Sequence, residues 1–433
     1  MTDKMGINGK KTADTSKAWF EIDNAANLYA GARSRDWCRT YRTALVFDEE
    51  IDPAVMQQAL EDTAKRFPYF CAKLRDGLFW SYFERVDSVP RLVPDTDFPY
   101  RPILIEGNDQ PNFRILYYKN RLVIEAFHSL SDGGGSNVFL STLAGRYFEL
   151  KGEVIPKTDR VLDVNSAPLE CETVDDYKAN ADKNAKAQNV PKTDIYLGEN
   201  NAEKNFVQLI HGIMRADDIK AVAKKHSLTV TEYFTVLIIY TFIKCADAPI
   251  EKPISVSVPI DLRKRFSSSS LRNFVYMTDV TFEPKGKTDI EFSQICESIK
   301  GKLGAKATRE YLVSSISANV AAQETPVIRV VPYAFKKVFL KNSYKKSQQA
   351  YTTFFSNLGL FEFPQGLSRH IVRAESCLAF TPHMHFGCAC ATVNGILTFT
   401  FSSSNRDTER QKFFFRFLAN DGVPVRIESN IYE

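Results

Sequence analysis

The sequence predicts an α/β protein of two lobes, each a mixed sheet flanked by helices. The chain has 433 residues, which exceeds the usual size of one hydrophobic core and favours two lobes of roughly 200 residues each. Strand-like and helix-like segments alternate in both halves. Between them, the stretch 151–204 is rich in Asp, Glu, Lys and Asn, which is typical of a connection between lobes. The expected division is a flexible N-terminal tail over 1–17, an N-terminal lobe over 18–165, a crossing linker over 166–205 and a C-terminal lobe over 206–433.

The first lobe is expected to alternate strands with one early helix. A strand over 42–47 precedes a helix that begins at Asp52, an N-cap residue followed by proline at the first helical position. Met56, Leu60 and Ala64 share one face of that helix. The later strands are expected over 78–86, 102–106, 113–118 and 122–127, the last two forming a hairpin.

The second lobe is expected to open with a short helix near Asp217, followed by a more apolar helix capped by Thr231. Asn394 and Gly395 form a strong hairpin signal between two apolar strands. Strands are expected over 254–260, 351–356, 360–363, 386–393, 396–402 and 423–427, and helices over 289–303 and 407–418.

The composition excludes several classes of protein. Apolar residues make up 44% and charged residues 25%, as in globular proteins, and the net charge of +4 comes without a long basic run, so nucleic acid is not an expected partner. The polar segment 1–17 lacks the apolar stretch of a secretory signal. The longest apolar run, 233–243, is shorter than the about 20 residues that span a bilayer and predicts a buried helix. The eight cysteines lie mostly inside apolar stretches, as reduced thiols do, and a cytoplasmic location is expected.

The most informative segment is 125–135, which reads EAFHSLSDGGG. It combines a strand end, a histidine, an acid four residues later and a glycine cluster before a helix. A histidine at a strand end can enter a cleft, and its near-neutral pKa suits removal of a proton from an alcohol or amine. Three glycines allow close backbone approach or positive φ at a helix N-terminus that favours developing negative charge. The alternative is a glycine-rich turn with a structural histidine.

His128, Asp132 and Gly133 reproduce a His-x-x-x-Asp-Gly motif, and through it the chain resembles the chloramphenicol acetyltransferase-like superfamily. That superfamily includes condensation domains, plant BAHD acyltransferases and alcohol acetyltransferases. The resemblance extends over nearly the whole chain and is to the bacterial alcohol acetyltransferase or condensation-like branch. Similar first-lobe segments are Asn27-Leu-Tyr29, Phe67-Pro68 and Gly77-Leu-Phe-Trp80.

The resemblance implies two similar lobes with a tunnel between them. It also implies direct acyl transfer from acyl-coenzyme A to a small-molecule hydroxyl or amine, with no bound cofactor. In such families the histidine, here His128, is the general base. The aspartate, here Asp132, points away from the substrate and fixes the loop that contains Gly133 and Gly134 through an ion pair with an arginine.

Arg263 is the candidate for that arginine, because it follows a predicted strand in a Leu-Arg segment like that of these families. A guanidinium can bind a carboxylate with two charge-assisted hydrogen bonds. Lys264 and Arg265 adjoin it, so a solvated basic turn is the alternative, and phosphate binding on coenzyme A is a third possibility.

Ser356 and Asn357 resemble a strand-end motif that lines the tunnel in the same families. A hydroxyl or amide there could donate to the oxyanion of a tetrahedral intermediate. A plain turn after a strand explains the asparagine and the following Gly359 equally well.

Two family features are missing from this chain. Condensation domains usually have a second histidine just before the catalytic one, where this chain has Phe127, so carrier-dependent peptide condensation is less favoured. The Asp-Phe-Gly-Trp-Gly signature of the plant family is also absent.

Other chemistries receive little support from the sequence. His383, His385, Cys388 and Cys390 form one candidate metal cluster, but the segment is apolar and core cysteines are the favoured interpretation, so no metal is expected. No cysteine or serine lies in a nucleophile motif. The leading hypothesis is an acyl-coenzyme A-dependent acyltransferase. The alternatives are a condensation-like enzyme that uses an acyl carrier protein and a noncatalytic binding protein of the same fold.

Overall fold

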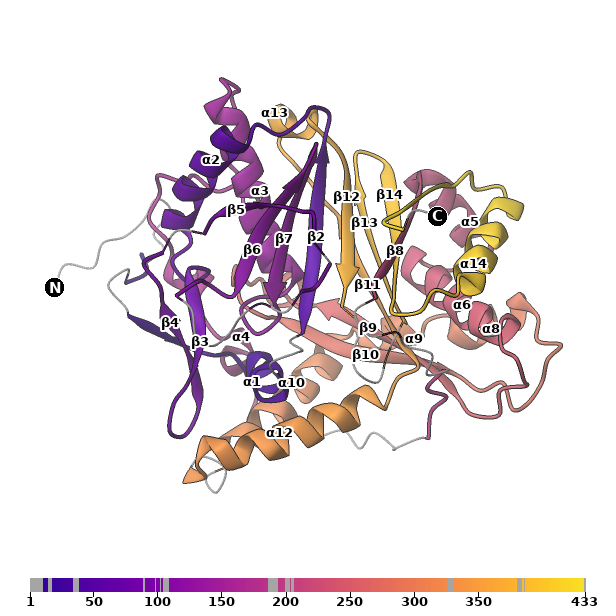
Figure 1. Ribbon diagram of the computed structural model, residues 1–433. Coiled ribbons are helices and arrows are strands. Elements are labelled where there is room, and N and C mark those ends of the chain that lie inside the picture. Colours follow the sequence, from indigo (N-terminus) through magenta and orange to yellow (C-terminus); the bar gives the residue numbers. More distant parts are fainter. Residues whose placement is uncertain are drawn as a thin grey trace.

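The computed structural model describes residues 11–14, 18–33, 39–88, 90–97, 99–101, 103, 109–185, 194–198, 203, 206–325, 330–379, 384 and 386–431. Two mixed sheets stand side by side, each with helices on one outer face (Figure 1). The two-lobed α/β fold predicted from the sequence is confirmed.

The first sheet has five strands in the order β12-β2-β7-β6-β5. All neighbouring strands are antiparallel except β5 and β6, which are parallel. Four of these strands come from the N-terminal part of the chain: β2 (Thr40–Phe47), β5 (Leu92–Pro94), β6 (Phe113–Tyr118) and β7 (Arg121–Phe127). Helices α2 (Pro53–Arg66) and α3 (Gly133–Leu150) cover the outer face of this sheet (Figure 1).

The fifth strand, β12 (Ile371–Leu378), comes from the C-terminal half and pairs with β2 in the first sheet. β12 also lies against β13 and β14 of the second sheet. The chain therefore crosses back between the sheets, and one strand links the two lobes. The domain boundaries expected from the sequence stay a prediction.

The second sheet has seven strands in the order β10-β9-β11-β13-β14-β8-β15. β11 is parallel to both of its neighbours, and the remaining pairs are antiparallel. The strands are β8 (Gln208–Arg215), β9 (Ile254–Asp261), β10 (Val275–Phe282), β11 (Thr353–Leu360), β13 (Phe386–Val393), β14 (Ile396–Ser403) and β15 (Arg426–Ser429). Its outer helices are α5 (Ala216–Lys225), α6 (Val230–Lys244), α8 (Phe292–Ile299) and α14 (Glu409–Asn420).

The remaining elements connect or flank the two sheets. A small sheet contains β1 (Trp19–Glu21), β4 (Ser81–Arg85) and β3 (Ala72–Asp76). Near it, α1 (Asn24–Ala32), α10 (Arg309–Glu324) and α12 (Tyr333–Gln348) form the lower edge of the molecule in Figure 1. Shorter helices are η1 (Glu170–Glu172), α4 (Asp176–Ala179), α7 (Arg263–Phe266), α9 (Lys302–Lys306) and α13 (Gln365–Ser368).

Each lobe has its own apolar core built around aromatic rings. In the first lobe Phe139 packs against Phe70 and Phe113, with ring centroids 5.1 Å apart in both pairs. In the second lobe Phe399 lies 4.8 Å from Phe234 and 4.6 Å from Phe414. Such buried rings contribute much of the apolar area that stabilises a fold of this size.

The apolar run 233–243 lies within α6, which is largely buried, as expected. In the described part of the chain, no single helix is long and apolar enough to span a membrane. Only α5 and α6 together meet the length and composition criteria, and they are bent by 76° relative to one another.

Several local expectations were wrong in detail. Thr229 rather than Thr231 caps α6. The Thr229 hydroxyl accepts a hydrogen bond from Glu232 N at 3.2 Å, and the Glu232 carboxylate accepts one from Thr229 N at 2.9 Å. This pair is a capping box. The strand expected over 360–363 is not formed, because β11 continues to Leu360 and the chain then leaves the sheet. The strand expected over 102–106 lies mostly outside the described residues.

Candidate active site

His128 follows the last residue of β7 and lines a cavity of about 290 Å³ between the two sheets. The first sheet contributes Tyr41 and Ser376 to this cavity, and the second contributes Met277 and Phe354. Two short stretches also face it: the motif loop over 132–134 and residues 356–363 around the end of β11. The sequence-predicted residues of both lobes are therefore brought together in one cavity.

One nitrogen of the His128 ring is bound by Asn273. His128 Nδ1 lies 3.1 Å from Asn273 Oδ1, and Asn273 Nδ2 donates to Asp23 Oδ2 at 3.1 Å. A carboxylate can only accept hydrogen bonds. The Asn273 amide must therefore turn its NH₂ toward Asp23 and its oxygen toward His128. His128 Nδ1 is then the donor, and the lone pair of the neutral imidazole is on Nε2.

Asp23 is a buried carboxyl at the N-cap of α1. Its Oδ1 accepts from Ala26 N at 2.7 Å, and its Oδ2 lies 3.7 Å from Arg272 Nε. Burial raises the pKa of Asp23 to about 6, with the Arg272 cation opposing the shift. The carboxyl is therefore mostly ionised at neutral pH and can hold Asn273 in the orientation described.

The surroundings of His128 keep its imidazole neutral. Burial lowers the pKa of His128 to about 4, and the nearby Arg39 cation adds to this shift. The Tyr29 ring lies 4.6 Å from the His128 ring and the Tyr41 ring 5.0 Å from it, which restricts rotation of the imidazole. At pH 7 the ring is therefore an unprotonated base that is fixed in one position.

Arg39 is held from the second half of the chain. Its Nη1 donates to Tyr344 Oη at 3.0 Å and to Gln348 Oε1 at 3.3 Å, both on α12. Its guanidinium also lies over the Phe354 ring, 5.5 Å from the centroid. α12 thereby positions the cation that lowers the pKa of His128.

The expected ion pair between Asp132 and Arg263 is present. Arg263 Nη2 donates to Asp132 Oδ1 at 2.8 Å and Nη1 donates to Oδ2 at 3.0 Å. The same carboxylate accepts from Gly135 N at 3.0 Å, as the N-cap of α3, and from Phe274 N at 2.7 Å. Four donors from two lobes thus bind one buried carboxylate, which fixes the loop after His128.

The three glycines after Asp132 are explained by close packing rather than by positive φ. A Cβ on Gly135 would lie 1.9 Å from the Leu271 carbonyl oxygen, and one on Gly134 would lie 2.7 Å from Arg263 Nη1. On Gly133 it would lie 2.8 Å from Leu358. The second lobe therefore lies directly against the first turn of α3. The backbone carbonyl of Leu271 leaves room only for glycine at position 135.

Ser356 and Asn357 both line the cavity, but their side chains differ in availability. Asn357 Nδ2 donates to Thr231 Oγ1 at 3.0 Å, and its Oδ1 accepts from Gly359 N at 2.9 Å. The Asn357 amide is thus used in the turn at the end of β11, where Gly359 has a φ of +73°. Ser356 has no such role and is the better placed of the two to donate a hydrogen bond into the cavity.

Sequence reasoning missed Asn273, Asp23 and Arg39. Asp23 carried one usable signal, an acid before a helical segment, which is typical of an N-cap. Asn273 and Arg39 lie in no motif, and each is 89 or more positions from His128 in the sequence.

The candidate metal cluster is only partly described. His383 and His385 lie outside the described residues, and Cys388 and Cys390 are buried in β13. Burial raises the pKa of the Cys390 thiol. Among the described residues, no group of three or more His, Cys, Asp or Glu side chains is arranged to bind a metal ion.

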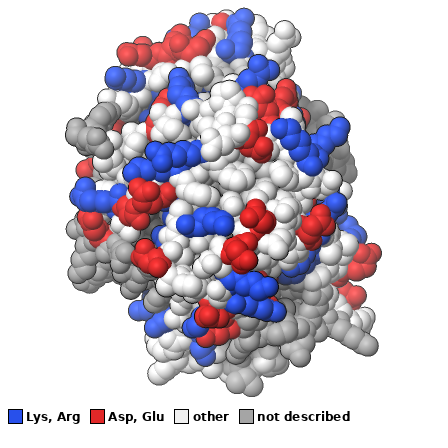
Figure 2. Space-filling model, turned by 90° about the vertical axis from the view of Figure 1, so that its right-hand side faces the viewer, with Lys and Arg blue, Asp and Glu red and all other residues white. Residues whose placement is uncertain are grey.

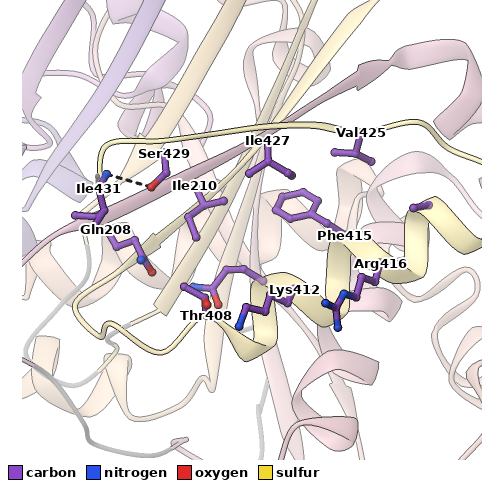
Figure 3. Close-up of a pocket in the computed structure, with 12 residues that line it drawn as sticks. Gln208, Ile210, Thr408, Lys412, Phe415, Arg416, Val425, Ile427, Ser429 and Ile431 are labelled. Carbon is purple, nitrogen blue, oxygen red and sulfur yellow. Dashed lines mark hydrogen bonds between the residues drawn. The ribbon is translucent and has the colours of Figure 1, made fainter. Parts of the chain in front are cut away.

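A second hollow of about 550 Å³ lies between α14 and strands β8 and β15 (Figure 3). Apolar side chains such as Phe415 and Ile427 form its walls, and Lys412 and Arg416 extend from α14 beside it. None of the predicted site residues lines this hollow, whereas His128, Asp132, Arg263 and Ser356 all line the cavity between the two sheets.

Comparison with known proteins gives a family and a fold. A family model described as alcohol acetyltransferase matches residues 173–421. No curated protein matches the sequence.

Solved structures match nearly the whole chain at low identity. Fusarium sporotrichioides TRI101, complexed with coenzyme A and T-2, has a TM-score of 0.61 and 11% identity and covers 95% of this chain and 100% of its own. Polyketide synthase associated protein 5 from Mycobacterium tuberculosis has a TM-score of 0.59 and 14% identity, with 92% and 96% covered. The first condensation domain of the CDA synthetase has a TM-score of 0.56 and 12% identity, with 95% and 100% covered. The solved structures show a shared fold, and together with the alcohol acetyltransferase match over 173–421 they confirm the resemblance to the chloramphenicol acetyltransferase-like superfamily.

Proposed function

Because the chain belongs to the alcohol acetyltransferase family, we propose that it transfers an acyl group from acyl-coenzyme A to a hydroxyl or amine, with His128 as general base. The observation that supports this most is the neutral imidazole of His128, fixed by Asn273 beside a cavity between the lobes. A base of this kind can act on an acceptor and a donor that meet in the cavity.

The reaction needs no covalent enzyme intermediate. The acceptor oxygen or nitrogen attacks the thioester carbonyl carbon while His128 Nε2 takes the acceptor proton. The tetrahedral intermediate then collapses, the carbon–sulfur bond breaks, and the imidazolium returns its proton to the leaving thiolate. The products are an ester or amide and free coenzyme A.

Other cavity residues are assigned supporting roles. Ser356 lines the cavity, and we assign its hydroxyl as a donor to the oxyanion of the intermediate, an interaction that is often a large contribution to catalysis. Asp132 and Arg263 hold the loop and do not exchange protons with the substrate. Lys264 and Arg160 also line the cavity and are the candidates for coenzyme A phosphates, since Arg263 is already bound to Asp132.

The donor assignment draws support from relatives. Fusarium graminearum TRI101 is complexed with coenzyme A and deoxynivalenol, and TRI3 is a trichothecene 15-O-acetyltransferase from Fusarium sporotrichioides. A condensation domain has a similar fold, so an acyl carrier protein is the second candidate donor. The phenylalanine at position 127 disfavours it, because condensation domains usually have a second histidine there.

A thiol-release assay tests the proposal. The purified chain is mixed with acetyl-, hexanoyl- and lauroyl-coenzyme A and a panel of alcohols and amines. We expect thiol release that requires both an acceptor and the enzyme. Transfer only from an acyl carrier protein would favour the condensation alternative, and thioester binding without release from either donor would favour a noncatalytic protein.

Asn273→Ala tests the tautomer assignment. Without the Asn273 oxygen, either imidazole nitrogen can hold the proton, so we expect kcat to fall by at least about tenfold while KM changes little. The hydrogen bond that His128 Nδ1 donates to Asn273 Oδ1 raises the pKa of His128, so its loss should also move the acid limb of the kcat/KM profile to lower pH. A matched control is Asn420→Ala, which removes an exposed asparagine at the end of α14, away from this cavity, and should leave kcat and the pH profile unchanged. An unchanged pH profile in Asn273→Ala would contradict a positioning role.

A further inference from the structure

The outward face of α12 exposes three large apolar side chains. Phe335 is 70% exposed, Val338 63% and Phe339 65%. The opposite face packs inward through Tyr333, Leu340 and Tyr344, a stripe at helical spacing, and Leu340 contacts Gly31 of α1. A helix with one buried stripe normally exposes polar residues on its other side, so the apolar outer face of α12 is a candidate interaction surface.

The charge of α12 is also unusual for this protein. Residues 333–348 include five lysines and no aspartate or glutamate. Lys337 pairs with Asp76 of the β3–β4 hairpin, whereas Lys341, Lys345 and Lys346 are exposed and have no ion-pair partner within the described part of the chain. On the face that contains α5, α8 and α14, basic and acidic side chains are instead intermixed (Figure 2).

The tip of the β3–β4 hairpin extends this apolar surface. Tyr333 N donates to the Leu78 carbonyl at 2.8 Å, and Lys336 Nζ donates to the Phe79 carbonyl at 2.7 Å, so the tip lies against the start of α12. At this tip Leu78 is 73% exposed and Trp80 56%. Tryptophan and lysine beside exposed apolar side chains are typical of surfaces at the boundary between lipid and water.

We propose that the outer face of α12 and the β3–β4 tip form a docking surface for a membrane that contains anionic lipids. The apolar side chains would enter the boundary between headgroups and acyl chains, and the lysines would bind lipid phosphates and carboxylates. A second copy of this chain fits less well, because a symmetric contact through α12 would place the same unpaired lysines against each other.

The position of α12 gives this docking a consequence for the reaction. Tyr344 and Gln348 on its inner face bind Arg39, which lies beside His128. Docking would therefore bring the cavity close to the lipid surface and favour acceptors or acyl chains that partition into membranes. This consequence rests on the proposed function, whereas the docking itself does not.

Vesicle flotation tests the apolar part of the surface. The full chain is mixed with vesicles of phosphatidylcholine alone, or of phosphatidylcholine and phosphatidylserine. We expect it to float with the anionic vesicles only and to be released by high salt. Phe335→Ser/Phe339→Ser should lose flotation, whereas Val154→Ser, which alters an exposed valine in the loop after α3, should keep it.

A charge variant tests the electrostatic part. Lys341→Glu/Lys345→Glu/Lys346→Glu should weaken binding to anionic vesicles by at least about tenfold. The control Lys224→Glu/Lys225→Glu changes two exposed lysines on α5 and should bind as the wild type does.

Three results would overturn the proposal. The first is failure of the wild-type chain to bind anionic vesicles, and the second is unchanged binding by the α12 variants. The third is a dimer that dissociates in Phe335→Ser/Phe339→Ser without any vesicle binding, which would assign the surface to self-association. Thiol release from a water-soluble substrate should be the same in all of these variants, so loss of docking is distinguishable from failure of the proposed function.

Discussion

His128→Ala is expected to lower turnover by about 10²–10⁴-fold, the usual effect of removing a general base. An alcohol is a poor nucleophile at neutral pH unless a base removes its proton during attack. Within the described residues, the other acids nearest the imidazole are already bound: Asp132 by Arg263 and Asp23 by Asn273. Neither can substitute for the missing base.

The His128→Ala variant should still fold and should still bind coenzyme A. The imidazole lines an open cavity, so water can replace it, and the melting temperature should stay close to that of the wild type. Coenzyme A should still raise that melting temperature. Loss of chemistry is thereby separated from loss of folding.

The measurement is thiol release under saturating acceptor, with His226→Ala as the control. His226 is the C-cap residue of α5, a helix on the outer side of the second sheet (Figure 1), and its removal should leave turnover near the wild-type value. If His128→Ala retained near wild-type turnover, the general-base assignment would be wrong and substrate positioning alone would have to explain the reaction.

Asp132→Asn is expected to destabilise the protein by about 3 kcal/mol, because removing one charge from a buried ion pair leaves the other uncompensated. The side chains of Asp132 and Arg263 are 2% and 10% exposed, so solvent does little to offset the loss. An asparagine would also lose one acceptor oxygen among the four donors that converge on this position. Activity should fall with stability, since this loop holds His128 in place.

Urea unfolding measures this effect, and Asp217→Asn supplies a matched control. Asp217 is in the first turn of α5 and pairs with Lys220 at 3.0 Å, but the two side chains are 72% and 66% exposed. Exposed pairs of this kind contribute at most about 1 kcal/mol. Equal stability of Asp132→Asn and the wild type would show that the ion pair does not hold the loop.

The sequence predicted those parts of the fold that local patterns encode. Alternation and capping located β2, α2 and the hairpin of β6 and β7, and the Asn394-Gly395 turn located the hairpin of β13 and β14. It missed β12 and α12. The burial pattern of β12 does not alternate, and α12 has lysines and phenylalanines together on its exposed face. Neither segment therefore shows the regular spacing of apolar residues that predicts a strand or a helix.

The candidate site also has a part that the sequence predicted and a part that only the structure shows. The motif over 125–135 is contiguous, so its histidine, acid and glycines could be read directly and Arg263 could be assigned from family resemblance. The reason for the glycines could not be read, because Leu271 and Arg263 approach them only after the second lobe packs onto α3.

The sequence by itself determined that this chain has two α/β lobes, because strand period and helix caps are local properties. Its short histidine motif is also local, and through family resemblance it predicted acyl transfer. The tertiary structure alone decided which groups control that histidine. Asn273 is 145 positions from His128 and 250 from Asp23, and α12 reaches Arg39 across 305 positions. The nitrogen that is free to act as a base and the pKa of the ring depend on desolvation and on these long-range contacts. Both arise only when the two lobes close around the cavity.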